Sequence, residues 1–186
     1  MLNPPRLWRH AELGVFKFIL GHWEGTICLP AFDRFVDAEK PPPSPYRLCF
    51  KVGEEAHEPS VSAIQIVREI IQNQNLLAPA IASALWNSFN GTGPSTGIWW
   101  HNCRNSDDEF DECEEIAEMK DIDELFQHMW FKGFRVMHHP DFNDALVAQL
   151  HFHSWFEAEH GVGFVTDGEN ILGLGYATEV LPFNTT

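Results

Sequence analysis

The stretch Gly161-Val-Gly-Phe-Val-Thr-Asp-Gly-Glu-Asn-Ile-Leu-Gly-Leu-Gly-Tyr-Ala177 decides the fold class of this chain. Its two apolar runs flank Asp167-Gly168, and such a pair between apolar runs is typical of a β-hairpin turn. Upstream, Phe131 to Met137 and Leu146 to Phe156 also have the composition of strands. The pattern therefore predicts that residues 131–182 form the C-terminal part of an antiparallel sheet.

Residues 10–53 predict an N-terminal β part. Apolar and polar residues alternate from Phe16 to Leu20, Gly21-His22 marks a turn, and a second strand-like run extends from Trp23 to Leu29. Two-residue periodicity that is broken by glycine favours a hairpin. After a proline-rich loop, Tyr46 to Val52 predicts a further strand.

Residues 60–89, between the two β parts, change to helical spacing. Ser60 or Ser62 can cap the start of a helix, and Asn73-Gln-Asn75 indicates a break. Pro79 is then tolerated in the first turn of a second helix. The pattern predicts a helical pair with one face on the sheet.

The remaining segments are a loop over residues 90–114 and a third helix over residues 115–130. Segregated strands and helices favour an α+β class. We therefore predict a single α+β domain over residues 1–186, with a largely antiparallel, twisted sheet. The helical pair packs on this sheet, and the third helix follows an acidic loop.

Composition and charge exclude several classes of protein. The 186 residues are 44% hydrophobic, which excludes global disorder. The 27 acidic and 12 basic side chains give a net charge of −15, which argues against duplex nucleic acid and anionic membranes as partners. Eleven acidic residues and one lysine lie between Asp107 and Glu124, so this segment carries a net charge of −10.

The distribution of apolar residues along the chain predicts the cellular compartment. Met1 to His10 lacks the apolar stretch of a signal peptide, and no apolar run approaches the roughly 20 residues of a spanning helix. These features predict a cytoplasmic protein.

The most distinctive motif is Phe156-Glu-Ala-Glu-His-Gly161, followed by a small apolar hairpin. It resembles a group of uncharacterised bacterial domains whose hallmark is a strand ending in Trp-Asp-x-Glu-His-Gly. Glu159, His160 and Gly161 match this motif, whereas Phe156 stands in place of tryptophan and Glu157 in place of aspartate. Members often occur near toxin–immunity loci, so the resemblance implies protein binding rather than catalysis.

Glu157, Glu159 and His160 form the first candidate cluster, because carboxylates beside an imidazole can act as acid and base or as metal ligands. The alternative is a structural turn. In that case a glutamate accepts backbone N–H bonds and Gly161 supplies a positive φ.

His151 and His153 extend this cluster if Leu146 to Phe156 is a strand, because both then lie on one face. Two such imidazoles can bind a divalent transition metal, and His138-His139 with Asp141 could complete the ligand set. A solvated polar face is the alternative.

Two further segments are candidates for partner binding. The first is the start of the acidic run, which comprises Asp107, Asp108, Glu109, Asp111 and Glu112. These carboxylates could meet a basic partner or bind calcium, or form a solvated loop that leads into a helix. The second is Trp99-Trp100, either as an exposed recognition pair or as a core anchor.

We therefore predict a non-enzymatic, immunity-like protein-binding domain that needs no cofactor. Its expected partner is a basic protein such as a toxin, which the acidic surface would attract. The alternative is a metal-dependent enzyme, such as a hydrolase, that uses the histidine and glutamate cluster with a divalent metal.

Overall fold

The computed structural model describes residues 6–36, 45–55, 57–105 and 111–183, without the side chains of residues 111–113 and 115. The described residues form nine strands. Their bounds are β1 Leu7–His10, β2 Gly14–Ile19, β3 His22–Ile27, β4 Tyr46–Lys51, β5 Met129–His139, β6 Ala145–Ser154, β7 Val162–Thr166, β8 Ile171–Tyr176 and β9 Glu179–Pro182. The helices are α1 Val61–Phe89, α2 Asp111–Glu118 and α3 Ile122–His128.

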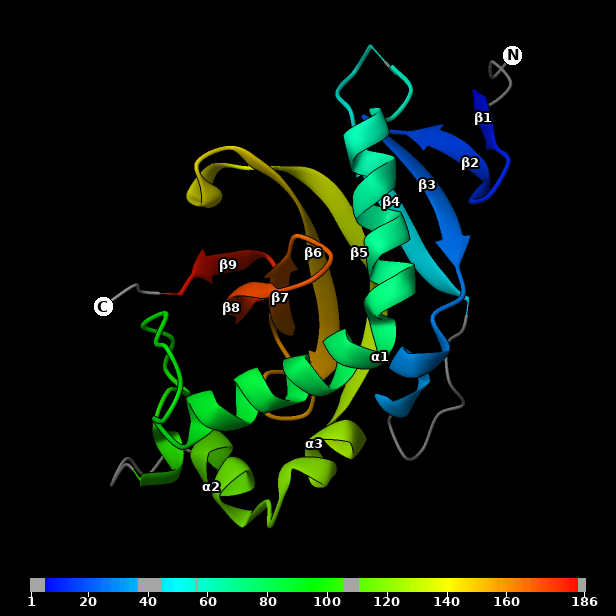
Figure 1. The fold of residues 1–186 in the computed structure, drawn as a ribbon. Helices are drawn as coiled ribbons and strands as arrows, with labels where there is room; N and C mark the ends of the chain where they lie inside the picture. Colours follow the sequence, from blue (N-terminus) through cyan, green and yellow to red (C-terminus); the bar gives the residue numbers. More distant parts are fainter. Residues whose placement is uncertain (1–5, 37–44, 56, 106–110, 184–186) are drawn as a thin grey trace.

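The described strands form one sheet in which spatial order follows chain order from β1 to β9 (Figure 1). All neighbouring strands are antiparallel except β4 and β5, which pair in parallel. A parallel pair needs a crossover, and α1, α2 and α3 lie in this connection. The predicted α+β class with a largely antiparallel sheet is confirmed.

Helix α1 begins and ends where the sequence indicates. The Ser60 side chain accepts a hydrogen bond from the Ala63 N–H at 3.1 Å and so caps the first turn. Asn90 ends the helix, and Gly91 follows with a φ of +66°.

The predicted helical pair is wrong, because residues 61–89 form one continuous helix that bends between its two halves (Figure 1). Pro79 lies inside this helix. Its missing N–H and its ring disturb the preceding turn, which bends the helix without ending it. The polar residues that suggested a break instead bind neighbouring loops. Gln74 accepts a hydrogen bond from Ala31 N–H, and the Asn73 amide donates to Gly168 O.

The third predicted helix is also divided. Instead of one helix over residues 115–130, α2 and α3 are separated by residues 119–121, and residues 129 and 130 belong to β5. Asp121 explains the division, because its side chain caps α3 by accepting hydrogen bonds from the N–H groups of Asp123 and Glu124.

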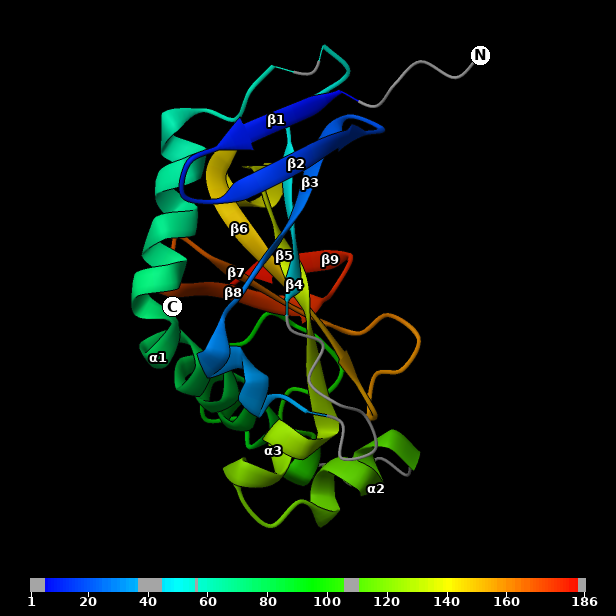
Figure 2. The same cartoon turned by 90° about the vertical axis from the view of Figure 1, so that its right-hand side faces the viewer.

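Helix α1 lies on one face of the sheet, as Figure 2 shows, and it contacts β5, β6 and β8. The core fills the space between these two layers and is rich in fully buried aromatic side chains: Phe16, Phe32, Phe35, Phe50, Phe89, Phe131, Phe152, Phe156 and Phe164. In β6, Leu150, Phe152 and Ser154 face this core, so His151 and His153 point to the opposite face, as predicted. Among the described residues, no helix has the length and apolar character needed to cross a membrane.

Candidate binding site

The connection between β6 and β7 forms a tight turn that positions the first candidate cluster. The Ser154 hydroxyl accepts a hydrogen bond from Glu157 N–H at 3.0 Å, and Gly161 N–H donates to Glu157 O at 2.9 Å. Gly161 has a φ of +67°, and a Cβ atom here would lie 2.4 Å from Phe152 O. Only glycine fits at this position without strain, so backbone geometry accounts for Gly161 at the end of the motif.

The carboxylate of Glu157 is the centre of the site. Its side chain is only 8% exposed. Its Oε1 accepts hydrogen bonds from His160 N–H at 3.2 Å and lies 3.1 Å from His160 Nδ1. Its Oε2 accepts a hydrogen bond from Trp99 Nε1 at 3.1 Å. The structural turn that the sequence suggested is therefore present, and it holds a buried carboxylate in one orientation.

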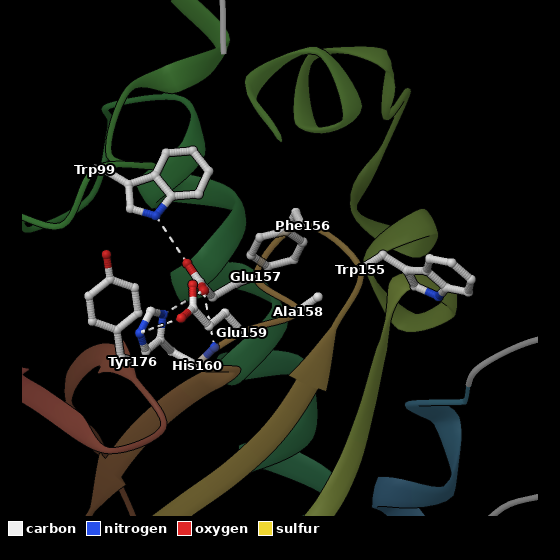
Figure 3. Close-up of a pocket in the computed structure, with 8 residues that line it drawn as sticks. All are labelled: Trp99, Trp155, Phe156, Glu157, Ala158, Glu159, His160 and Tyr176. Atoms are coloured by element: carbon white, nitrogen blue, oxygen red, sulfur yellow. Dashed lines mark hydrogen bonds and ion pairs between the residues drawn. The ribbon is translucent and has the colours of Figure 1, made fainter. Parts of the chain in front are cut away.

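A cavity of about 460 Å³ opens beside this carboxylate. This volume lies within the usual range for small-ligand sites. The described residues that line the cavity are Trp99, Trp155, Phe156, Glu157, Ala158, Glu159, His160 and Tyr176. In Figure 3, Trp99, Tyr176 and His160 surround Glu157, whereas the ring of Trp155 points away from it.

Three separate segments meet at this cavity. Trp99 comes from the loop after α1, Glu157 and His160 come from the turn after β6, and Tyr176 ends β8 (Figure 3). The ring of His160 packs on Tyr176 with centroids 4.9 Å apart. The site therefore combines aromatic surface with a fixed carboxylate.

The cavity is negatively charged. Glu159 is 85% exposed at its mouth, and its Oε1 lies 4.0 Å from His160 Nε2. Burial, followed by the negative charges of Glu157 and Glu179, raises the pKa of Tyr176. The eight described lining residues include no lysine or arginine. Such surroundings favour a cation.

Two kinds of chemistry are compatible with this geometry. A carboxylate beside aromatic faces can bind an ammonium or guanidinium group. A carboxylate that orients an imidazole, as Glu157 orients His160, can also support a general base. The described lining residues offer no serine, threonine or cysteine as a nucleophile.

The two adjacent tryptophans have different roles. Trp99 is 36% exposed and lines the cavity, whereas Trp100 is fully buried. The ring of Trp100 packs edge-on against Phe156 and Tyr176 at 5.9 and 5.6 Å. The hypothesis of an exposed pair is therefore wrong for Trp100, which anchors the loop in the core.

His151 and His153 do not line this cavity. His153 stacks on Trp130 with ring centroids 5.0 Å apart, and His151 lines a small cavity beside Arg135 and Lys132. Positive neighbours disfavour a divalent metal at His151. Among the described residues, no group of three or more histidine, cysteine, aspartate or glutamate side chains could hold a metal ion.

The other proposed ligands lie at the opposite end of β6 from His151 and His153. His138 Nδ1 lies 2.7 Å from Asp144 O in the turn before β6. His139 is largely buried, packs on Phe142, and has its Nδ1 3.7 Å from Asp141 Oδ2. These histidines belong to the β5–β6 turn.

Asp107, Asp108 and Glu109 lie outside the described residues, so their predicted role stays a prediction. Asp111 and Glu112 belong to the backbone of α2, but their side chains also lie outside the described part.

Sequence reasoning missed Tyr176 as a site residue. Its position at the end of β8 was visible, but only the pairing of β7 with β8 brings it beside His160. Sequence reasoning also missed Trp155 as a site residue. In the structure it follows the end of β6, is 51% exposed and lines the cavity.

Comparison with known proteins identifies the family. The family model for a domain of unknown function, DUF6985, matches residues 43–181. The chain belongs to this family. The match covers β4 to β8, all of β9 except Pro182, helices α1 to α3 and every described residue that lines the cavity. No curated protein and no solved structure gave a significant match.

Proposed function

We propose that this member of the DUF6985 family is a non-enzymatic, immunity-like binding domain whose cavity accepts a basic side chain of a partner protein. The observation that carries the proposal is the buried carboxylate of Glu157 beside the aromatic rings of Trp99 and Tyr176. A basic protein such as a toxin is the expected partner.

The geometry suits a lysine or arginine side chain. Trp99 donates to Glu157 Oε2, and a carboxylate oxygen can accept more than one hydrogen bond. A cation near an aromatic face gains about 0.5–2 kcal/mol, with the larger value where water is excluded. The exposed carboxylate of Glu159 would add attraction at the mouth of the cavity.

The acidic segment would act over a longer range. Arg104 lies in the same loop as Trp99, and its Nη1 donates hydrogen bonds to Ile116 O and Met119 O at the end of α2. This contact holds α2 against the loop that supplies one wall of the cavity. Negative charge around α2 would therefore increase the rate at which a basic partner meets the cavity, and salt would weaken the effect.

The test is affinity capture at low and high salt, using the wild-type chain and two variants. Glu157→Gln removes the buried charge of the cavity, whereas Glu58→Gln removes an exposed charge elsewhere. We expect the wild type and Glu58→Gln to capture the same basic protein at low salt and to release it at high salt. Glu157→Gln should capture much less of it. Failure to recover any basic partner, or equal capture by Glu157→Gln, would contradict the proposal.

A further inference from the structure

A second, much smaller cavity of about 70 Å³ lies on the face of the sheet opposite α1. Its described lining residues are Arg47, Cys49, Lys132, Gly133, Phe134, Arg135 and His151. Three of the chain's 12 lysine and arginine residues therefore meet here, in a chain whose net charge is −15. This local excess of positive charge opposes the charge of the whole protein.

Strand pairing explains why these residues meet. Arg47 of β4 pairs with Gly133 of β5, which in turn pairs with His151 of β6. The β5–β6 register shifts between Phe131 and Gly133, so β5 bulges at Lys132. Gly133 has a φ of +135°, and a Cβ atom here would lie 2.1 Å from Arg47 O. Glycine therefore allows β4 and β5 to approach where the cations gather.

His151 provides an unused polar group in this cavity. Its Nε2 atom is buried and has no hydrogen-bond partner in the described part of the chain. A buried ring nitrogen without a partner loses its hydration without compensation, which destabilises the folded protein. A ligand that accepts a hydrogen bond from the neutral ring would remove this cost.

The charge balance indicates the class of ligand. Three cationic side chains line the cavity, and one of them, Arg47, forms an ion pair with Glu24 of β3. The carboxylate of Glu24 balances one positive charge, so the cavity keeps a net charge of +2. The cationic groups and the imidazole offer more donors than the two oxygens of one carboxylate require. A phosphate group carries nearly two negative charges and at least three acceptor oxygens.

We propose that the cavity formed by Arg47, Lys132, Arg135 and His151 is a binding site for a phosphate-sized oxyanion. The ligand is either free phosphate or the phosphoryl group of a larger molecule. This site is separate from the cavity at Glu157, since the two share no described lining residue. The fold would thus present an acidic site and a basic site for different ligands.

The test is calorimetric titration of the full chain with inorganic phosphate at low ionic strength. The His151 ring signals are followed by NMR in parallel. We expect saturable binding with a dissociation constant on the order of 1 mM and a shift of the His151 signals. Arg135→Gln and Lys132→Gln should each weaken binding about tenfold, which corresponds to about 1.4 kcal/mol. The matched control Arg9→Gln removes an exposed positive charge from β1 and should bind like the wild type.

The proposal fails if phosphate does not saturate the wild type, or if Arg9→Gln weakens binding as much as Lys132→Gln does. Lys132 is exposed, so its variant keeps the test valid if Arg135→Gln does not fold. Titration with acetate and with a phosphomonoester separates the ligand sources. Tighter binding of the phosphomonoester would support a phosphoryl ligand, and tighter binding of phosphate would support the free ion. Acetate binding as tight as phosphate binding would overturn the choice of phosphate.

Discussion

The indole Nε1 of Trp99 donates a hydrogen bond of 3.1 Å to Oε2 of Glu157, which lies 58 positions later in the chain. This bond joins the loop after α1 to the turn after β6. It therefore fixes both an aromatic wall and the carboxylate of the candidate site. The same bond connects the stability of the fold to the proposed function.

Glu157→Gln should lower the free energy of unfolding by about 1–3 kcal/mol, because charge-assisted hydrogen bonds to a buried carboxylate are lost. Urea unfolding at neutral pH measures this difference. The exposed control Glu58→Gln should change stability by less than about 0.5 kcal/mol. Equal stability of Glu157→Gln and the wild type would show that the carboxylate does not hold the turn.

Gly161→Ala should destabilise the protein more than Gly53→Ala does. Both glycines have a positive φ, so alanine strains each backbone by roughly 1–2 kcal/mol. At Gly53 the new Cβ would have no heavy atom within 4 Å, whereas at Gly161 it would lie 2.4 Å from Phe152 O. Thermal unfolding of the two variants measures the difference. Equal losses would argue against the close approach of the turn to β6.

His151 should make stability depend on pH below neutrality. Burial, followed by the positive charges of Arg135 and Arg47, lowers the pKa of His151 to about 4. In the unfolded chain a histidine titrates near 6.5. Between these values the unfolded state binds more protons, so stability is complete above pH 6.5 and decreases as the pH falls toward 4. The loss at pH 4 should be on the order of 2–3 kcal/mol.

Urea unfolding at pH 7 and pH 4.5 measures this dependence. The titratable groups that line the cavity with His151 are Arg47, Cys49, Lys132 and Arg135. Two further titratable groups lie near His151. Glu24 forms an ion pair with Arg47, and His153 lies on the same face of β6 as His151. His151→Gln should lose less stability on acidification than the wild type. His57→Gln, which removes an exposed histidine, should lose as much as the wild type. Identical pH dependence in all three proteins would contradict the assignment.

Purified protein should contain no stoichiometric transition metal, because the structure separates His151 and His153 from Glu157 and His160. Elemental analysis of protein purified without chelators provides the measurement. One metal ion per chain that is lost in His160→Ala but kept in His57→Ala would favour the alternative of a metal-dependent enzyme.

Local sequence signals predicted most of the strands. The hairpin at Asp167-Gly168 and the strand that carries Phe152 depend on turn chemistry and on two-residue alternation, which act over short distances. The helix cap at Ser60 was visible for the same reason.

The errors in the helices arose where two local signals conflict. Pro79 and the polar residues at 73–75 together suggested a break, but tertiary contacts to Ala31 and Gly168 satisfy those side chains within a bent helix. Asp121 has the opposite effect, because its capping side chain starts a new helix inside residues 115–130, which were predicted to form one helix.

The candidate site could be predicted only in part. Glu157, Glu159 and His160 are neighbours in the chain, so their proximity was visible from the motif. The positions of Trp99 and Tyr176 depend on long-range packing and strand pairing. The two tryptophans at 99 and 100 could not be distinguished, because burial of one ring depends on contacts with Phe156 and Tyr176.

The most direct test of the proposed function is the NMR signal of the Trp99 Nε1–H group during titration with blocked lysine and arginine amides. Blocked glutamine amide serves as the uncharged control. If the cavity accepts a basic side chain, this signal shifts and saturates with lysine or arginine, and the response is lost in Glu157→Gln. It should not respond to glutamine. An unchanged signal, or an equal response to glutamine, would contradict the account.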